Sequence, residues 1–156
     1  MADNGLGSGN RENLKILAEG LIKNKNITTL DLAYNDLGSG KAEHLNILAE
    51  AFIKNTNIIS LGLSRNGFGL GTAENLKILR EVLVKNQNIT SIDLRTNYLG
   101  KGNAENLKIL AEALKNQNIT TVNLSNNELG IGNEENLKIL SETMLQKSKY
   151  RDRLFK

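Results

Sequence analysis

The chain has 156 residues, of which 39% are hydrophobic and 24% charged, a composition typical of one soluble globular domain. Cysteine is absent and His44 is the single histidine, which excludes disulfides, thiolate zinc sites and histidine-rich metal sites. No apolar run approaches the roughly 20 residues that cross a bilayer, and no secretory signal is visible. We therefore expect no membrane insertion and a cytoplasmic or otherwise intracellular location.

The basic charge is concentrated at the C-terminal end. The formal net charge is +3, and the last ten residues hold five basic residues against one acidic residue. The remaining chain is nearly neutral, which does not favour a surface built for a polyanion, so no nucleic-acid partner is expected. The basic and aromatic tail at 150–156 favours a C-terminal cap. An acidic partner, nucleic acid or a membrane surface is the alternative contact for this tail.

One phrase recurs five times along the chain. It starts as Asn13-Leu-Lys-Ile-Leu-Ala-Glu, and its leading leucines are spaced 31, 31, 31 and 30 residues apart, at Leu14, Leu45, Leu76, Leu107 and Leu137. Such self-similarity indicates a stack of repeated structural units. The predicted boundaries are a half-unit at 1–26, repeats at about 27–57, 58–88, 89–118 and 119–149, and the tail.

Each unit combines two hydrophobic periods. Residues 27–32 alternate apolar and polar side chains toward their end, which predicts a short strand, and residues 58–63, 89–94 and 119–124 repeat this pattern. Residues 14–21 place Leu14, Leu17, Ala18 and Leu21 on one helical face, with Ile16 and Gly20 on a flank that a neighbouring helix would cover. The sequence therefore predicts four strands and five helices in alternation.

Polar residues mark both ends of each predicted helix. N-caps are expected at Asn10, Thr72, Asn103 and Asn133, with Lys41 as the exception. A residue in the left-handed conformation is expected to end the helices at Asn24, Asn55, Asn86 and Asn116. Because strands and helices alternate without long loops, the strands should be parallel and each unit should bury its apolar faces against the next.

The strand and the turn after it carry a known signature. The segment Ile27-x-x-Leu30-x-Leu32-x-x-Asn35-x-Leu37 matches L-x-x-L-x-L-x-x-N-x-L, as do residues 58–68, 89–99 and 119–129. The chain resembles the leucine-rich-repeat family, and its helix in every unit is similar to the ribonuclease-inhibitor-like subfamily. The resemblance implies a right-handed, curved α/β solenoid, with the parallel sheet on the concave side and helices on the convex side. It also implies that Asn35, Asn66, Asn97 and Asn127 bond to backbone groups of neighbouring units.

Several motifs could be read as chemical sites, but a structural role explains each of them better. The Gly-x-Gly loops before the helices lack the full phosphate-loop pattern and recur in nearly every unit, so we interpret them as turns. His44 is interpreted as a tolerated surface variation, since no second histidine or cysteine accompanies it. Asp31 and Asp93 are expected two strands apart with Gly62 between them, a spacing that could suit paired carboxylates, but no cleft or second constellation supports hydrolysis. No enzyme activity, catalytic residue, cofactor or metal is predicted.

The outward strand positions and strand ends are the predicted protein-binding surface. Most are small and polar, and binding hot spots favour aromatic residues and arginine, which directs attention to Tyr34, Arg65 and Arg95. The full candidate set is Asp31, Tyr34, Arg65, Asp93, Arg95, Tyr98, Asn123 and Asn126. Four short strands offer roughly 300 Å², against about 800 Å² per partner in a standard interface. Loops, tail or further repeats are therefore needed for tight binding.

The sequence leaves two functions open. The first is a non-enzymatic module that binds a protein partner of unknown identity on the concave sheet and adjoining loops. The second is a structural or self-associating array, including an end-to-end homodimer or a fragment of a longer protein. The richness in Lys, Asn and Ile suggests an AT-rich genome, such as that of an intracellular bacterium. For a bacterial source, a host protein is one candidate partner, which would require delivery into the host cell.

Overall fold

The computed structural model describes residues 1–131 and 134–148 of the chain. Helices and strands alternate throughout, in the order α1 (Arg11–Lys23), β1 (Thr29–Asp31), α2 (Ala42–Lys54), β2 (Ser60–Gly62), α3 (Ala73–Lys85), β3 (Ser91–Asp93), η1 (Leu99–Lys101), α4 (Ala104–Leu114), β4 (Thr121–Asn123) and α5 (Glu134–Ser148). The predicted tail at 150–156 and the predicted cap Asn133 lie outside the described residues.

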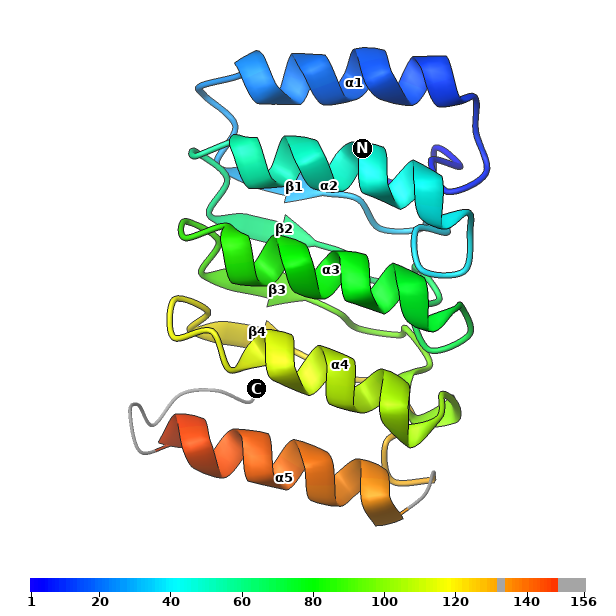
Figure 1. Ribbon diagram of the computed structural model, residues 1–156, viewed down its shortest axis with the longest axis vertical. Helices are drawn as coiled ribbons and strands as arrows, with labels where there is room; N and C mark the ends of the chain where they lie inside the picture. Colours follow the sequence, from blue (N-terminus) through cyan, green and yellow to red (C-terminus); the bar gives the residue numbers. More distant parts are fainter. Residues whose placement is uncertain (132–133, 149–156) are drawn as a thin grey trace.

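The four strands form one parallel sheet in the order β1-β2-β3-β4. Leu30 pairs with Leu61, Leu61 with Ile92, and Ile92 with Val122, so equivalent residues of successive units lie side by side. The helices form a second layer on one face of this sheet, stacked in chain order (Figure 1). The structure thus confirms the α/β solenoid of parallel strands that the repeats predict.

The apolar core runs along the whole stack between the two layers. The central residue of every strand is buried, and Leu61 and Ile92 are completely inaccessible. Helix residues spaced three and four apart complete the same cluster, as in Leu45, Leu48 and Phe52 of α2. No unit closes its own core, because each buried face is shared with the next unit.

Buried asparagines in the turns after the strands join neighbouring units, as predicted. The Oδ1 atom of Asn66 accepts hydrogen bonds from the amides of Asn35 and Leu37, both at 3.1 Å. Its Nδ2 atom donates to the carbonyl of Leu32 at 2.9 Å. Asn97 binds the next turn in the same way, with Oδ1 accepting from the amide of Asn66 at 2.9 Å. These side chains satisfy buried backbone groups that have no helical or strand partner.

A second set of asparagines ends the helices, but not in the predicted left-handed conformation. The C-caps Asn24, Asn55 and Asn86 have φ of −73°, −78° and −79°, which is extended backbone. The Oδ1 atom of Asn55 accepts from the amides of Asn57 and Ile58 at 2.8 and 3.1 Å, and its Nδ2 atom donates to the preceding unit. The amide side chain therefore forms the turn, and a left-handed backbone is not needed there.

The interpretation of His44 as a surface variation is wrong. The residue is 2% exposed, and its Nδ1 atom lies 3.0 Å from the carbonyl of Gly7 in the preceding turn. Asn75 occupies the equivalent position in α3 and donates from Nδ2 to the carbonyls of Leu37 and Gly40 at 2.9 and 3.1 Å. This position near the helix start is a third link between units, and an imidazole can replace the amide because both reach a backbone carbonyl.

The predicted N-caps hold in two of the three described cases. Asn10 accepts from the amide of Glu12 at 2.8 Å, and Asn103 accepts from the amide of Asn106 at 2.8 Å. Thr72 forms no cap and instead donates to Oδ1 of Asn75 at 2.9 Å.

The Gly-x-Gly turns are a packing device, as interpreted from their recurrence. A Cβ atom at Gly38 would lie 2.5 Å from the backbone of Phe68, and one at Gly69 would lie 2.0 Å from the carbonyl oxygen of Tyr98. Successive turns therefore stack backbone on backbone, which only glycine allows.

Candidate functional site

Two rows of side chains project from the sheet face that lies away from the helices. We call this the open face. The residues before and after each buried central residue are exposed or half-buried, and the parallel register aligns them from strand to strand. The first row consists of Thr29, Ser60, Ser91 and Thr121, and the second of Asp31, Gly62, Asp93 and Asn123.

Three side chains of the second row accept hydrogen bonds from backbone amides in the turns that follow their strands. Oδ1 of Asp31 accepts from the amide of Ala33 at 2.9 Å, and Oδ1 of Asp93 accepts from the amide of Arg95 at 3.0 Å. Asn123 does the same with the amide of Ser125 at 3.1 Å. These three candidate residues therefore fix the backbone at the strand ends and still present polar atoms on the open face.

Asp31, Asp93 and Arg95 form one charged cluster around Gly62. The Arg95 guanidinium pairs with Asp93 at 2.7 Å between Nη2 and Oδ2, and its Nε donates to both carboxylate oxygens. This hydrogen bonding and the carboxylate charge raise the pKa of Arg95, and Asp31 acts in the same direction. A Cβ atom at Gly62 would lie 3.0 Å from Oδ1 of Asp31, so the Asp31 carboxylate lies against the open position that glycine leaves.

Tyr34 and Arg65 follow adjacent strands and form a stacked pair. The Arg65 guanidinium carbon lies 4.7 Å from the centre of the Tyr34 ring, within cation–π range. Tyr34 is 47% exposed and Arg65 is exposed, so the stack presents an aromatic ring and a cation to solvent. The pair brings together two of the predicted anchor residues.

Both residues of the pair have left-handed backbone, which sequence reasoning missed. In each described turn one left-handed residue lies three positions after the last strand residue, or at the matching place before α1, and a second lies two positions later. The first set is Asp3, Tyr34, Arg65, Thr96 and Asn126, and the second is Gly5, Asp36, Gly67, Tyr98 and Glu128. Gly5 and Gly67 were the available signal, because glycine is the residue that most readily adopts this conformation.

Tyr98 belongs to a different cluster from the Tyr34–Arg65 pair. It lies in the second left-handed set, immediately before η1, and Lys101 lies 5.0 Å from the centre of its ring. Lys101 also pairs with Glu128 of the next unit at 3.2 Å. Tyr98 is thus tied to the turns beside the open face. Asn126 is exposed at the end of β4, in the same position as Arg65.

An exposed isoleucine adds an apolar element that sequence reasoning did not identify. Ile59, the residue immediately before β2, is 48% exposed. Thr28, Thr90 and Thr120 occupy the equivalent position in the other units. The sequence signal for this residue was the replacement of threonine by isoleucine in one unit. An isoleucine that faces solvent is not explained by burial in the core.

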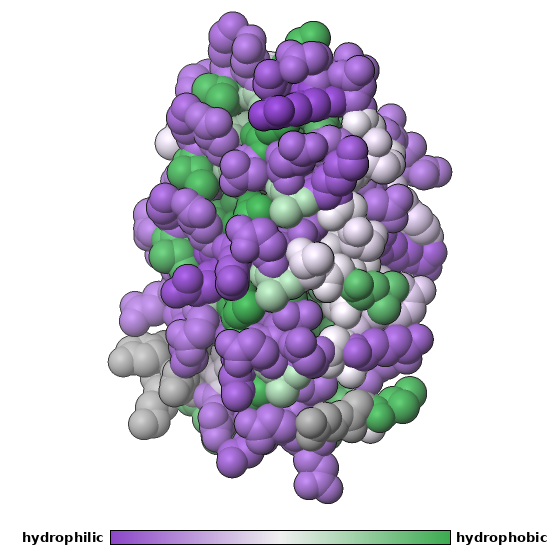
Figure 2. All heavy atoms as spheres, turned by 45° about the vertical axis from the view of Figure 1, so that its right-hand side comes forward, coloured by the Kyte–Doolittle hydropathy of each residue, from purple (hydrophilic) through white to green (hydrophobic). Residues whose placement is uncertain are grey.

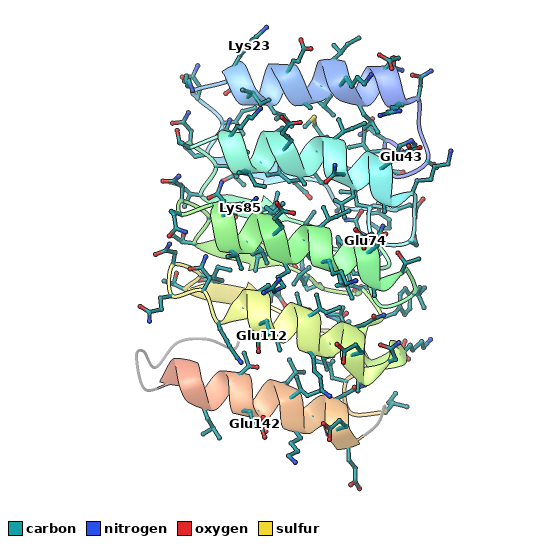
Figure 3. The ribbon with its side chains drawn as sticks, in the orientation of Figure 1. Lys23, Glu43, Glu74, Lys85, Glu112 and Glu142 are labelled. Carbon is teal, nitrogen blue, oxygen red and sulfur yellow. The ribbon has the colours of Figure 1, made fainter. Side chains whose placement is uncertain are left out.

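The helix face has a different character from the open face. Its charges include pairs along single helices, among them Glu50–Lys54 at 2.6 Å, Glu81–Lys85 at 2.5 Å and Glu112–Lys115 at 2.5 Å. Lys85 of α3 and Glu112 of α4 are labelled in Figure 3. Exposed pairs of this kind contribute little free energy. Across the helices and the turns at their starts, apolar residues appear as isolated spots in a mainly hydrophilic surface (Figure 2).

The described part of the chain offers neither a metal-binding cluster nor a membrane-spanning helix. No group of three or more histidine, aspartate or glutamate residues there is placed to hold a metal ion. None of the helices described combines the length and the hydropathy that crossing a bilayer requires.

Comparisons with known proteins agree with this architecture. A family model described as "Leucine Rich repeat" matches residues 23–40 and 115–133. No curated protein matches the sequence. The leiomodin-1 structure named "Actin-Binding Site 2" has a similar fold, with a TM-score of 0.61 and 19% identity over 96% of this chain and 82% of that one.

Two further solved structures match with lower TM-scores. The leucine-rich-repeat-containing protein LegL7 from Legionella pneumophila has a TM-score of 0.44 and 21% identity, covering 94% of this chain and 62% of that chain. The tropomodulin C-terminal domain from Caenorhabditis elegans has a TM-score of 0.44 and 12% identity, covering 90% and 95%.

Proposed function

We propose that this chain, a leucine-rich-repeat protein, is a non-enzymatic module that binds a protein partner on the open face of its sheet. The observation that carries the proposal is the exposed Tyr34–Arg65 stack, which lies at the end of adjacent strands. Aromatic residues and arginine dominate protein-binding hot spots, and a stacked pair held by a sheet loses little side-chain freedom when it binds.

The neighbouring residues suit a partner with mixed chemistry. Asp31, Asp93 and Arg95 offer both charges around the space at Gly62, and Ile59 offers an apolar contact at the other end of β2. Along one strand, Ile59 and Arg65 are separated by roughly 20 Å, a span that a short segment of a partner can cover. The Tyr98–Lys101–Glu128 cluster would extend the contact onto the turns.

A protein is the ligand class that the comparisons support. The leiomodin-1 region that shares the fold is named for an actin-binding site, so the ligand of that protein is itself a protein. In this chain the fold presents side chains in rows across the sheet, aligned by the strand register.

The proposal can be tested by photo-crosslinking from two faces of the same protein. A photoreactive amino acid replaces Ser125 on the open side or Asn46 on the outer face of α2; both positions are exposed. Extracts of cells that express the protein supply the partner, which is then purified for direct binding measurements. We expect a defined partner to crosslink from position 125 and not from position 46. Equal crosslinking from both positions would contradict the proposed face.

Substitutions then measure the anchor residues on the purified pair. Tyr34→Ala and Arg65→Ala are expected to weaken binding at least about tenfold each, which corresponds to the loss of one hot spot. Arg80→Ala is the matched control, because Arg80 is an exposed arginine on the opposite layer, in α3. Unchanged affinity in both open-face variants would show that the partner binds elsewhere.

A further inference from the structure

The first strand of the sheet has backbone amides without a strand to receive them. At the start of β2, the amides of Ile59 and Ser60 both donate to the carbonyl of Thr28, at 2.8 and 3.0 Å. β3 and β4 repeat this double donation toward the strand that precedes each of them. Thr28 and Thr29 hold the same positions in β1, which is the edge strand of the described sheet. Their two amides therefore point to the place of a preceding strand.

The turn that normally follows such a strand is nevertheless complete. The amide of Asp3 donates to the carbonyl of Ala33 at 2.9 Å, as the amide of Tyr34 does to that of Ser64 at 3.1 Å in the next unit. Asp3 also shares the left-handed backbone of Tyr34. Met1 thus stands where Leu32 stands in the first full repeat. Along the β1 edge, only the strand position itself has no described occupant.

Apolar side chains around this position are less buried than their equivalents. Leu6, Leu17 and Ile27 are half-buried, whereas the equivalent residues in the next unit, Leu37, Leu48 and Ile58, are completely inaccessible. α1 lies one helix beyond α2, while β1 lies at the level of α2 (Figure 1). We use the name β1 slot for the exposed edge of β1 at residues 28–31 together with these three half-buried side chains.

We propose that the β1 slot binds one extended segment of a partner protein, parallel to β1, with branched apolar residues three positions apart. The interior strands define this chemistry: in β3, Ile89 and Ile92 fill the equivalent space and both are 0% exposed. One carbonyl of the segment would accept hydrogen bonds from the amides of Thr28 and Thr29. The carbonyl of Ile59 accepts from Thr90 and Ser91 in the same way. Such strand addition combines backbone bonds for affinity with alternate apolar side chains for specificity.

A second copy of this chain fits the slot poorly. Each described strand has a helix covering its inward face, and α1 already occupies the place of that helix over the slot (Figure 1). Pairing β1 with a strand of another copy would bring two helices to the same place. The occupant must therefore be a strand that carries no helix of its own, and an end-to-end dimer through this edge is disfavoured.

The first experiment places a strand in the slot covalently. The segment Asn-Ile-Thr-Ser-Ile-Asp, copied from residues 88–93, is added directly before Met1 of the full chain, so that Met1 takes the place of Leu94. Amide hydrogen exchange at Thr28 and Thr29 should slow at least about tenfold, and the melting temperature should rise by about 4 °C or more. The matched control carries Ile89→Thr and Ile92→Thr in the added copy, which keeps strand propensity and removes the apolar contacts. Equal effects of both extensions, or no effect of either, would overturn the proposal.

The second experiment supplies the strand as a separate molecule. A peptide of residues 86–94 is titrated into the isotopically labelled chain, and backbone resonances are followed. Saturable shifts at Thr28, Thr29 and Leu17 that disappear with the doubly substituted peptide support the proposal. Shifts confined to β4, or none, oppose it.

A proline substitution in the edge strand β1 tests separately whether the chain still folds and whether it self-associates through this edge. Thr29→Pro removes an amide that has no strand partner, so it should leave the chain folded while abolishing peptide binding. Thr121→Pro should destabilise the fold, because that amide donates to the carbonyl of Thr90 at 3.0 Å. If sedimentation shows that the unmodified chain dimerises and that Thr29→Pro abolishes the dimer, the occupant is a second copy and the proposal is wrong.

Discussion

Replacing Asn66 with alanine tests whether the turn asparagines hold the solenoid together. The substitution leaves the buried amides of Asn35 and Leu37 without their acceptor, since both bond to Oδ1 of Asn66 at 3.1 Å. The two carbonyls that accept from its Nδ2 keep other donors: Leu32 receives the Asn35 side chain, and Ser64 receives the amide of Tyr34. The expected loss is therefore that of two unsatisfied buried amides, about 1–3 kcal/mol each and about 2–6 kcal/mol together.

A loss of that size is a large share of the about 5–15 kcal/mol that stabilises a typical domain. Urea denaturation followed by circular dichroism measures it, with the midpoint and the slope fitted separately. Asn46→Ala is the matched control: Asn46 is exposed on α2, and alanine there should be neutral or stabilise by up to about 0.7 kcal/mol. If Asn66→Ala costs no more than this control, the amides have other partners and the proposed role of the turn asparagines is refuted.

Two further predictions use matched positions in the repeats. Gly69→Ala should strongly destabilise the fold because its Cβ would lie 2.0 Å from the Tyr98 carbonyl, whereas Gly20→Ala, with nothing within 4 Å in the middle of α1, should stabilise it by about 0.5–1 kcal/mol. The opposite signs are measured by urea denaturation, and equal signs would contradict the stacking argument. Leu48→Ala should cost about 2–5 kcal/mol and Leu17→Ala clearly less, because the two leucines are equivalent in sequence but only Leu17 is half-buried. Thermal melts of the two variants decide this, and an equal loss would show that the N-terminal unit is packed as tightly as the interior.

The repeat spacing was sufficient to predict the architecture. Two periods of hydrophobicity in each unit identified a short strand and a helix, and the equal spacing of units required parallel strands in register. The structure pairs Thr29 with Ser60 and Ser60 with Ser91, which are separated by one repeat each. The role of the turn asparagines was predictable from the family resemblance, because asparagine recurs at the same place in four turns.

Backbone conformation in the turns was much harder to predict. Tyr34, Thr96 and Glu128 adopt left-handed φ of 58°, 54° and 57°, although such side chains rarely favour it. The bonds between stacked turns impose this geometry, so the cause lies in the neighbouring unit and not in the local sequence. For the same reason His44 was misinterpreted: its partner is Gly7, 37 residues away, and a lone histidine gives no sign of that contact.

The candidate site was located by position, but its internal contacts were not foreseen. The strand pattern predicts Asp31, Asp93 and Arg95 on the open face. In the structure Asp31 and Asp93 end β1 and β3, and Arg95 is exposed two residues after Asp93. Sequence reasoning treated Arg95 as a free anchor, whereas it pairs with Asp93 of its own strand. Which rotamer a solvent-facing side chain adopts depends on local charges and turns, and hydrophobic periodicity contains no information about either.

The units themselves indicate which positions are free to carry function. Positions that fill the stack are apolar in every unit, as Leu30, Leu61 and Ile92 illustrate, and the turn asparagines recur unchanged, because each unit must fit the next. The first left-handed residue after each strand obeys no such rule. It is Tyr34, Arg65, Thr96 or Asn126 in successive units. Stacking requires only the backbone conformation there, so differences among these side chains contribute nothing to the core. Their divergence within one chain supports the proposal that the open face binds a protein partner, since Tyr34 and Arg65 are two of these residues.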